Sequence, residues 1–405
     1  MNRYPRFAAL FMLMLLSSFS LRALDAGLLL DQNADLNTRG VSENADSKFE
    51  YSGIFIPRIS ALLGDDGEFI VSAGINYAAA PFSVIPELLR TELTMRFGMG
   101  EIKLGRMPYR DPLGVVAEGF FDGASFSYDT RAGTLSAGGW YTGLLYKKRA
   151  AIAMTDDEDQ LYYKEVNYND FMNTYYAPRR VLASAGWEHP SLWGLLNIKL
   201  AVLSQFDMTG SGLNSQYFSV KAAMLPFRYI ALDAGGCFEV VEYGEDSGVA
   251  LAAEVGFTWM PPARFENHVS LRGRFSSGVV EDSPMRAFQP LTTIPQGNVL
   301  QAKLSGLSVV SLGYLARLYR TVSADVTASY FVRSDLGTYT HYPVVNANSN
   351  GYFLGAELYA RLLWSISTGV QMKMGGGMFL PSLGDAAPNA GMLWTANLNM
   401  IISFF

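Results

Sequence analysis

The sequence lacks a second cysteine, so no disulfide can form within the chain. Cys237 is the one cysteine in 405 residues, and the fold has to be stable without the bridges that exported proteins often carry. Charged residues are scarce, at 17% against ~25% in soluble proteins. Histidine occurs only at His189, His268 and His341, which is too scattered for a metal-ligand spacing. We therefore expect no metal site and no cofactor.

Long apolar runs are also missing from the interior of the sequence. No internal stretch reaches the ~18 consecutive apolar residues that mark a spanning helix, although aromatic residues make up 13% of the chain. Hydrocarbon tolerates only helices and closed barrels, because each unsatisfied backbone group costs several kcal/mol there. The composition therefore favours a transmembrane β-barrel. The net charge of −6 argues against a nucleic-acid partner.

The N-terminus has the composition of an export signal. Arg3 and Arg6 give a basic start, an apolar run follows over 7–19, and Ala23 supplies a small residue at a cleavage point. We expect a cleaved signal peptide over 1–23 and a barrel domain over 24–405. An uncleaved membrane anchor is the alternative.

Apolar and polar residues alternate with a period of two along most of the chain, which predicts β-strands. Residues 322–330 and 354–362 show the pattern clearly. A soluble sandwich alternates too, but aromatic residues here collect at strand ends, as in the interfacial girdles of membrane barrels. These aromatic residues are Tyr51, Tyr77, Trp187, Trp259, Tyr352, Trp364 and Trp394.

Connections alternate between short and long, as in outer-membrane barrels with short periplasmic turns and long outer loops. Short turns are predicted at 64–67, 98–100, 130–133, 190–191, 226–227, 261–262, 320–321 and 363–364. Longer polar connections are predicted near 32–47, 147–178, 278–300, 334–350 and 380–390. The count gives a closed antiparallel barrel of eighteen strands, or sixteen if one hairpin folds inward. Both termini are then periplasmic, and the last strand resembles the segment that the barrel-assembly machinery recognises.

The polar phase of each strand predicts the lining of the lumen. Its cations outnumber its anions, which points to a mildly cationic, wet pore, since charged rings bias permeation. The alternative is that these charges pair across strands and only fill space. The candidate pore-lining residues are Arg58, Arg90, Glu92, Arg96, Lys103, Lys199, Lys221, Asp233, Glu254, Arg272, Arg274, Asp325, Glu357, Arg361 and Lys373.

Arg106 and Asp122 fall in the lipid-facing phase of two adjacent strands. A mid-membrane Arg on that face costs roughly 2–4 kcal/mol. We expect an ion pair at the rim that holds the loop 110–116. The alternative is that Gly105 and Gly123 form bulges that turn both side chains inward.

Two stretches carry a family resemblance. The segment 104–112, Leu-Gly-Arg-Met-Pro-Tyr-Arg-Asp-Pro, followed by Phe121-Asp122-Gly123, resembles the strand ends of substrate-selective porins. The segment 355–358, Gly-Ala-Glu-Leu, followed by the glycine-rich 375–381, resembles the closing region of alginate-export-type barrels. The resemblance implies an eighteen-stranded bacterial outer-membrane barrel with a charged pore for an anionic polymer or a small solute.

We therefore expect an outer-membrane channel for passive diffusion of small polar solutes, anionic or saccharide ones among them. The expected partners are outer-membrane lipid, the barrel-assembly machinery and the solute, with the chain as a monomer or homotrimer. An enzyme is disfavoured, because no histidine lies beside a nucleophile motif. A fatty-acid-type transporter of hydrophobic substrates and a non-conducting adhesin or structural barrel remain alternatives.

Overall fold

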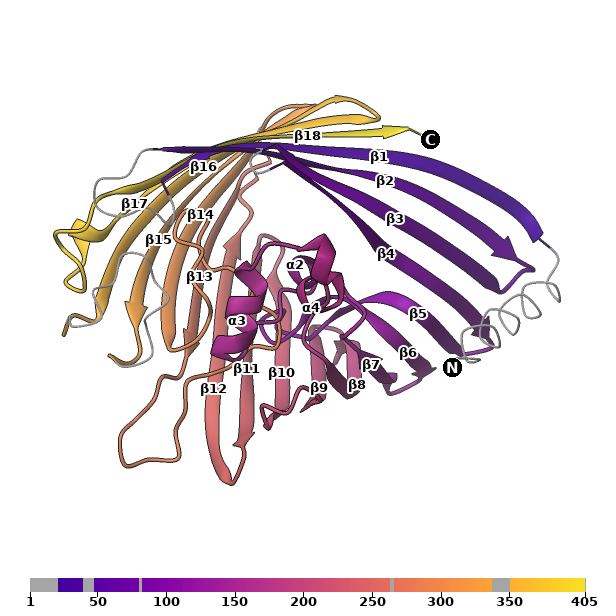
Figure 1. The fold of residues 1–405 in the computed structure, drawn as a ribbon, viewed down its shortest axis with the longest axis horizontal. Coiled ribbons are helices and arrows are strands. Elements are labelled where there is room, and N and C mark those ends of the chain that lie inside the picture. The colour runs from indigo at the N-terminus through magenta and orange to yellow at the C-terminus, as the bar shows by residue number, and fades with distance from the viewer. Residues whose placement is uncertain (1–20, 39–46, 80–81, 263–265, 337–349, 405) are drawn as a thin grey trace.

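The computed structural model describes residues 21–38, 47–79, 82–262, 266–336 and 350–404. These residues form eighteen antiparallel strands in one sheet, and the pairing of β1 with β18 closes it into a barrel (Figure 1). At the closure, Leu28 lies opposite Phe404 and Asn37 lies opposite Thr395. The predicted fold class and the number of eighteen strands are confirmed, and the alternative of sixteen is wrong.

Each strand pairs with its neighbours in sequence, in a simple up-and-down order. The strands are β1 (Leu21–Asn37), β2 (Lys48–Leu63), β3 (Gly67–Ala79), β4 (Phe82–Phe97), β5 (Gly100–Arg110), β6 (Glu118–Thr130), β7 (Gly133–Tyr141), β8 (Arg180–Leu192), β9 (Leu196–Asp207), β10 (Leu213–Phe227), β11 (Ile230–Tyr243), β12 (Asp246–Trp259), β13 (His268–Ser276), β14 (Leu307–Tyr319), β15 (Val322–Arg333), β16 (Phe353–Ser367), β17 (Val370–Leu380) and β18 (Leu393–Phe404). The shortest have nine residues, which is enough to cross a bilayer when tilted.

The alternation of residues decides which face of each strand points outward. In β12 the side chains of Leu251, Val255 and Phe257 are exposed, whereas Ala252 and Glu254 are buried between them. Apolar residues therefore cover the outside of the barrel, and polar or small residues line the inside except where the wall packs against the loops. This is the inverse of a soluble protein and fits a sheet surrounded by hydrocarbon.

One end of the barrel carries short turns and the other carries the long loops. The turns at 64–66, 98–99, 131–132 and 320–321 agree with the predictions. The predicted turn at 363–364 is wrong, because β16 continues to Ser367 and the chain turns at 368–369. The turns predicted at 190–191 and 226–227 lie inside the ends of β8 and β10. The alternating pattern fixes the phase of a strand but not the residue at which it ends.

The long loops 142–179 and 277–306 fold into the barrel (Figure 1). Loop 142–179 carries α2 (Lys147–Ala150), α3 (Asp156–Tyr163), a 3-10 turn at Tyr168–Asp170 and α4 (Phe171–Thr174). A second 3-10 turn, Pro381–Leu383, follows β17. No helix among the described residues is long and apolar enough to span a membrane. The predicted signal peptide falls mostly on residues 1–20, outside the described ranges, so it stays a prediction.

The arrangement of turns and loops predicts an orientation in the cell. We expect a Glu281→Cys variant to react with a membrane-impermeant maleimide on intact cells, because Glu281 is exposed on a long loop. A Pro262→Cys variant, on the short-turn side, should react only after permeabilisation. The native Cys237 is 2% exposed and gives a low background. Labelling of Pro262→Cys on intact cells would show that the barrel has the opposite orientation.

Candidate functional site

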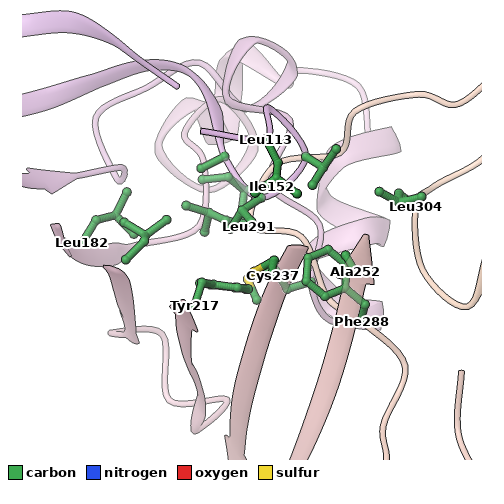
Figure 2. Packing of buried hydrophobic residues seen from close by; sticks show 14 of the residues in the cluster. Leu113, Ile152, Leu182, Tyr217, Cys237, Ala252, Phe288, Leu291 and Leu304 are labelled. Atoms are coloured by element: carbon green, nitrogen blue, oxygen red, sulfur yellow. The ribbon is translucent and has the colours of Figure 1, made fainter. Parts of the chain in front are cut away.

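The inner wall and three loops meet in an apolar cluster, which we call the lumenal cluster. Leu113 of loop 111–117, Ile152 of loop 142–179 and Leu291 of loop 277–306 are its loop members (Figure 2). They pack against wall residues such as Tyr217 of β10 and Ala252 of β12. Because apolar burial stabilises by ~25 cal/mol per Å², this cluster holds the loops inside the barrel and narrows it.

Buried carboxylates fix the loops that enter the lumen. Asp111 accepts hydrogen bonds from the backbone N–H groups of residues 113, 114, 116 and 117 at 2.9–3.0 Å. Burial raises the pKa of Asp111, and these four amides partly offset the rise. Glu158, at the start of α3, binds the guanidinium of Arg180 at 2.6 Å. Both Glu158 and Arg180 are buried, so the pair ties loop 142–179 to the first residue of β8.

Glu357 of β16 holds the tip of loop 277–306. Its carboxylate accepts hydrogen bonds from the backbone N–H groups of Asn298, Val299 and Leu300 at 2.6, 3.0 and 2.9 Å. Gly297, directly before them, has φ +80°, and such a turn points successive N–H groups at one anion. The side chain is 2% exposed. Glu357 was predicted to line the pore, and its observed contacts are those of an anchor for the loop.

A second charged cluster joins three strands of the wall to the same loop. Glu254 accepts from Lys221 at 2.6 Å and from Arg274 at 3.3 Å. Arg274 also donates to the side-chain oxygen of Gln296 at 3.0 Å. Of the two arginines of β13, Glu254 therefore pairs with Arg274 and not with Arg272.

Most of the other predicted lining charges pair with a neighbour. Glu92 lies 2.7 Å from Arg90 and 4.0 Å from Lys103. The remaining pairs are Arg96–Glu101, Lys103–Glu101, Lys199–Glu188 and Arg361–Asp325, at 2.8–3.2 Å. Of these, Arg96–Glu101, Lys199–Glu188 and Arg361–Asp325 join neighbouring strands, and such cross-strand pairs stabilise the sheet by a few tenths of a kcal/mol to ~1 kcal/mol each. Together the pairs leave little net charge.

Three predicted cations are exceptions. Within the described part of the chain, Arg58, Arg272 and Lys373 have no carboxylate within 4.0 Å. They lie on β2, β13 and β17, so they are spread around the wall. The excess positive charge predicted for the lumen is therefore concentrated at a few positions.

Arg106 and Asp122 form a bidentate ion pair, with Nε–Oδ1 at 2.9 Å and Nη2–Oδ2 at 2.7 Å. We expected the pair to hold residues 110–116. Arg106 instead donates to the carbonyls of Leu88 and Leu144, so the pair anchors the start of loop 142–179. Gly105 has φ +104°, and a Cβ there would meet the carbonyl oxygen of Thr91 at 1.7 Å. The strand thus requires glycine beside this arginine.

A polar cavity of about 380 Å³ lies between the wall strands β12–β15 and residues 295–298 of loop 277–306. This volume lies within the range of small-molecule sites. Arg272 and Arg274 supply its positive charge. Five hydroxyl side chains line it, namely Thr258, Ser270, Ser311, Thr327 and Ser329.

Glu87 of β4 is a buried charged residue that our reading of the sequence missed. It accepts from Arg149 of α2 at 3.0 Å and from Asn76 at 2.9 Å. Ser72 of β3 pairs with Arg90 and Ala73 pairs with Leu88, so Leu89 is an extra, unpaired residue in β4. This irregularity brings Glu87 onto the same face as Glu92, whereas strict alternation would place them on opposite faces. Lys147 lies two residues before Arg149 on α2. Burial and the neighbouring charges of Lys148 and Lys164 lower the pKa of Lys147 to about 8.

Comparison with known proteins gives similarity of structure and none of sequence. No family model matches the chain, and no curated relative matches it. Pseudomonas aeruginosa OccK2 (OpdF), solved in complex with glucuronate, has a TM-score of 0.63 at 12% identity, over 95% of this chain and 99% of that one. OccK11 (OpdR) and the outer membrane protein OpdK of the same organism both score 0.61. Their identities are 11% and 13%, over 95% of this chain and 97% and 99% of theirs.

At these identities the similarity shows the fold, an eighteen-stranded barrel. It agrees with the porin resemblance carried by residues 104–123. The descriptions of these structures name no alginate-export protein, so the resemblance of residues 355–381 to such barrels stays a prediction.

The contacts of Glu357 predict the effect of its replacement. In Glu357→Gln the three amides lose a charged acceptor, so the tip of loop 277–306 should open more often. We expect trypsin to cut after Lys303 about tenfold faster, the factor for losing ~1.5 kcal/mol of charge-assisted hydrogen bonding. Asp325→Asn, which removes a partly exposed ion pair on the adjacent strand, should leave the rate nearly unchanged. Equal cleavage of wild type and Glu357→Gln would show that the carboxylate does not hold the loop.

Proposed function

We propose that this chain is a bacterial outer-membrane channel for the passive diffusion of small polar solutes, with a weak preference for anions. The observation that carries the proposal is the closed barrel with an apolar exterior and a charged interior, narrowed by loops and containing a polar cavity. Barrels of sixteen to eighteen strands are wide enough to leave an aqueous channel.

The exterior supports contact with lipid. Its exposed residues are predominantly Leu, Val, Phe and Tyr, as on β12, β14 and β18. Leu398 and Phe404 of β18 are exposed on this face, in the alternation expected of a strand that the barrel-assembly machinery recognises. The chain inserts through this strand and acts as a monomer or homotrimer.

The lumen supports the passage of polar solutes over hydrophobic ones. Apolar residues of the lumenal cluster are buried against each other, whereas the cavity in the wall is lined by hydroxyl, amide and guanidinium groups. Solutes that fit a cavity of about 380 Å³ and carry hydroxyl or carboxylate groups match those donors. Glucuronate, which is bound in one structural neighbour, belongs to this chemical class, and a small saccharide or carboxylate is the solute we propose here.

A liposome-swelling assay tests the channel directly. We expect liposomes that contain the folded protein to swell in isosmotic monosaccharide and more slowly in disaccharide, because a lumen narrowed by three loops sieves by size. Liposomes without protein are the control. No swelling with correctly folded protein would favour the fatty-acid or adhesin alternatives.

Variants of the two arginines of β13 distinguish a role in solute passage from a role in stabilising the fold. Arg272→Gln should shift the reversal potential in a salt gradient toward cations and leave the melting temperature unchanged, because no described carboxylate pairs with Arg272. Arg274→Gln should lower stability by roughly 1–3 kcal/mol, since it breaks hydrogen bonds to Glu254 and Gln296. Arg272→Lys keeps the charge and is the matched control. Unaltered selectivity in Arg272→Gln would assign the anion preference to other residues.

A further inference from the structure

The wall of the barrel is not one continuous sheet at its loop end. β4 and β5 diverge from their shared turn (Figure 1), and their pairing stops at Thr91 and Arg106, although β4 extends further. The hairpin 107–121 stays paired within itself but has left both neighbours, because β7 pairs with β6 only as far as Asp122. The tip of this hairpin packs in the lumenal cluster. Among the described residues, no strand therefore pairs with residues 82–90 of β4 on the side that faces β5, and we call this edge the seam.

The sequence itself keeps the seam free of strand pairing. The carbonyl of Pro86 points to the seam, where the hydroxyl of Tyr175 donates to it at 2.8 Å. The N–H and C=O groups of one strand residue point to the same side, so the N–H that a neighbouring strand would need here is missing. Pro108 of β5, two residues beyond the last pair, has no N–H either. Proline is found within sheets almost only at such edges, so the seam is a built-in feature of the wall.

Side chains cover the seam in place of a strand, and most of them come from loop 142–179. Alternate carbonyls along the seam, those of Val84, Pro86 and Leu88, each accept one side-chain hydrogen bond. The donors are, in the same order, Tyr168, Tyr175 and Arg106. The two tyrosines belong to the loop, and the arginine belongs to β5 at the foot of the seam.

An ion pair joins the same loop to the seam. Arg149 of α2 lies 3.0 Å from Glu87 of β4, whose side chain is buried. Residues 145–147 and 175–177 of the loop run antiparallel, with two backbone hydrogen bonds between them at 2.9 and 3.0 Å. Two chain segments thus lie beside β4 on the side that the two strands of the hairpin 107–121 have left.

The seam lies at the level of the membrane. Thr91, at its lower end, is six residues from Phe97 at the turn, which corresponds to about 20 Å along the strand and about 15 Å of height at a tilt of about 45°. The apolar band of such barrels is about 25 Å tall, so the seam begins near its middle and runs through the half nearest the loops. Val84 and Leu88, whose side chains alternate with the buried Glu87, are exposed apolar residues beside it.

Closure by a loop differs from closure by a strand. Paired strands do not part in hydrocarbon, because each freed backbone group would be left without a partner. At the seam, two hydroxyl hydrogen bonds and one ion pair hold the loop to β4, and Tyr168 is 60% exposed. Arg106 keeps its bond to the carbonyl of Leu88 when the loop moves, because it belongs to the wall. The seam is therefore the part of the described wall that opens at the lowest cost.

We propose that loop 142–179 is a lateral gate, through which the lumen opens along the seam to the membrane leaflet on the loop side. This route would serve single-chain amphiphiles and is separate from the axial route for polar solutes. Opening uncovers Glu87 and Arg149, which match a zwitterionic head group, next to Val84 and Leu88, which match an apolar chain. Two strand positions are about 10 Å wide, which admits one extended chain. A wholly polar solute does not enter from lipid, and a wholly apolar one leaves the charges without a partner.

A reversible crosslink across the seam tests the gate. In Glu87→Cys/Arg149→Cys, a short reducible bismaleimide would tie β4 to α2 in the full-length barrel, while the buried Cys237 stays unreacted. The probe is a fluorescent lysophosphatidylcholine, added to liposomes that contain the barrel and trapped serum albumin. The fraction of probe that external albumin no longer extracts measures transfer out of the outer leaflet. Swelling in monosaccharide measures the axial route.

We expect the crosslink to reduce transfer to that of liposomes without protein, because the gate cannot open, and reduction of the linker to restore it. Monosaccharide swelling should stay unchanged throughout, since the linker lies in the wall. Glu188→Cys/Lys199→Cys is the matched control. These two residues form an ion pair between two paired strands, so the same crosslink there should leave transfer unchanged.

Two hydroxyl deletions test the gate without a linker. Tyr168→Phe/Tyr175→Phe should raise transfer about tenfold, as for the loss of two hydrogen bonds of ordinary net strength, with swelling unchanged. Tyr330→Phe is the control, because the hydroxyl of Tyr330 on β15 donates to a loop carbonyl, that of Leu383, at 2.9 Å. It removes the same kind of bond away from the seam and should leave transfer unchanged.

The two measurements separate the gate from the polar channel. Transfer that is the same with and without the crosslink, or is unaltered in the tyrosine variant, would overturn the lateral gate and leave the channel standing. Loss of transfer and swelling together in the crosslinked form would also overturn the gate, because both would then share the axial route. Transfer that follows the crosslink in barrels that do not swell would retain the gate and overturn the polar channel.

Discussion

The structure depends on the need to pair every backbone N–H and C=O group inside the sheet. Hydrocarbon offers no partner for these groups, so the strands close, β1 onto β18. Closure of eighteen strands, however, makes a ring too wide for wall side chains to fill. The loops 111–117, 142–179 and 277–306 fill part of that space. The way in which these loops are held therefore determines the shape of the lumen.

Beside the lumenal cluster, buried carboxylates hold these loops, and each uses backbone amides or a guanidinium as its partner. Asp111 closes its own loop on four amides, Glu357 binds three amides of another loop, and Glu158 binds Arg180. Hydrogen bonds to an ionised acceptor are stronger than neutral ones, and they occupy the lone pairs that burial would otherwise leave unsatisfied. A loop that enters a barrel has few backbone partners of its own, so the wall has to supply them.

The sequence is a good guide to the wall and a poor guide to its contacts. Alternation along β12 or β15 shows which residues share a face, and the strand number follows from the turns. It does not show which inward charge meets a loop. Arg272 and Arg274 point to the same face of β13, so the alternation cannot tell them apart, yet only Arg274 reaches Glu254 and Gln296. Gln296 lies on a loop, whose path the alternation of the strands does not predict. Glu87 was missed because one register shift reverses the phase of β4.

The packed interior is also unevenly distributed around the ring, and this has a mechanical consequence. The two apolar clusters of described residues draw on β6–β12 and on β14–β18, and neither includes a residue of β1–β3. Those three strands are held by pairing with their neighbours and by local side-chain contacts such as Tyr51–Tyr77, whereas the opposite wall is braced by packed loops. Lateral pressure from the bilayer would thus deform the barrel first along β1–β3.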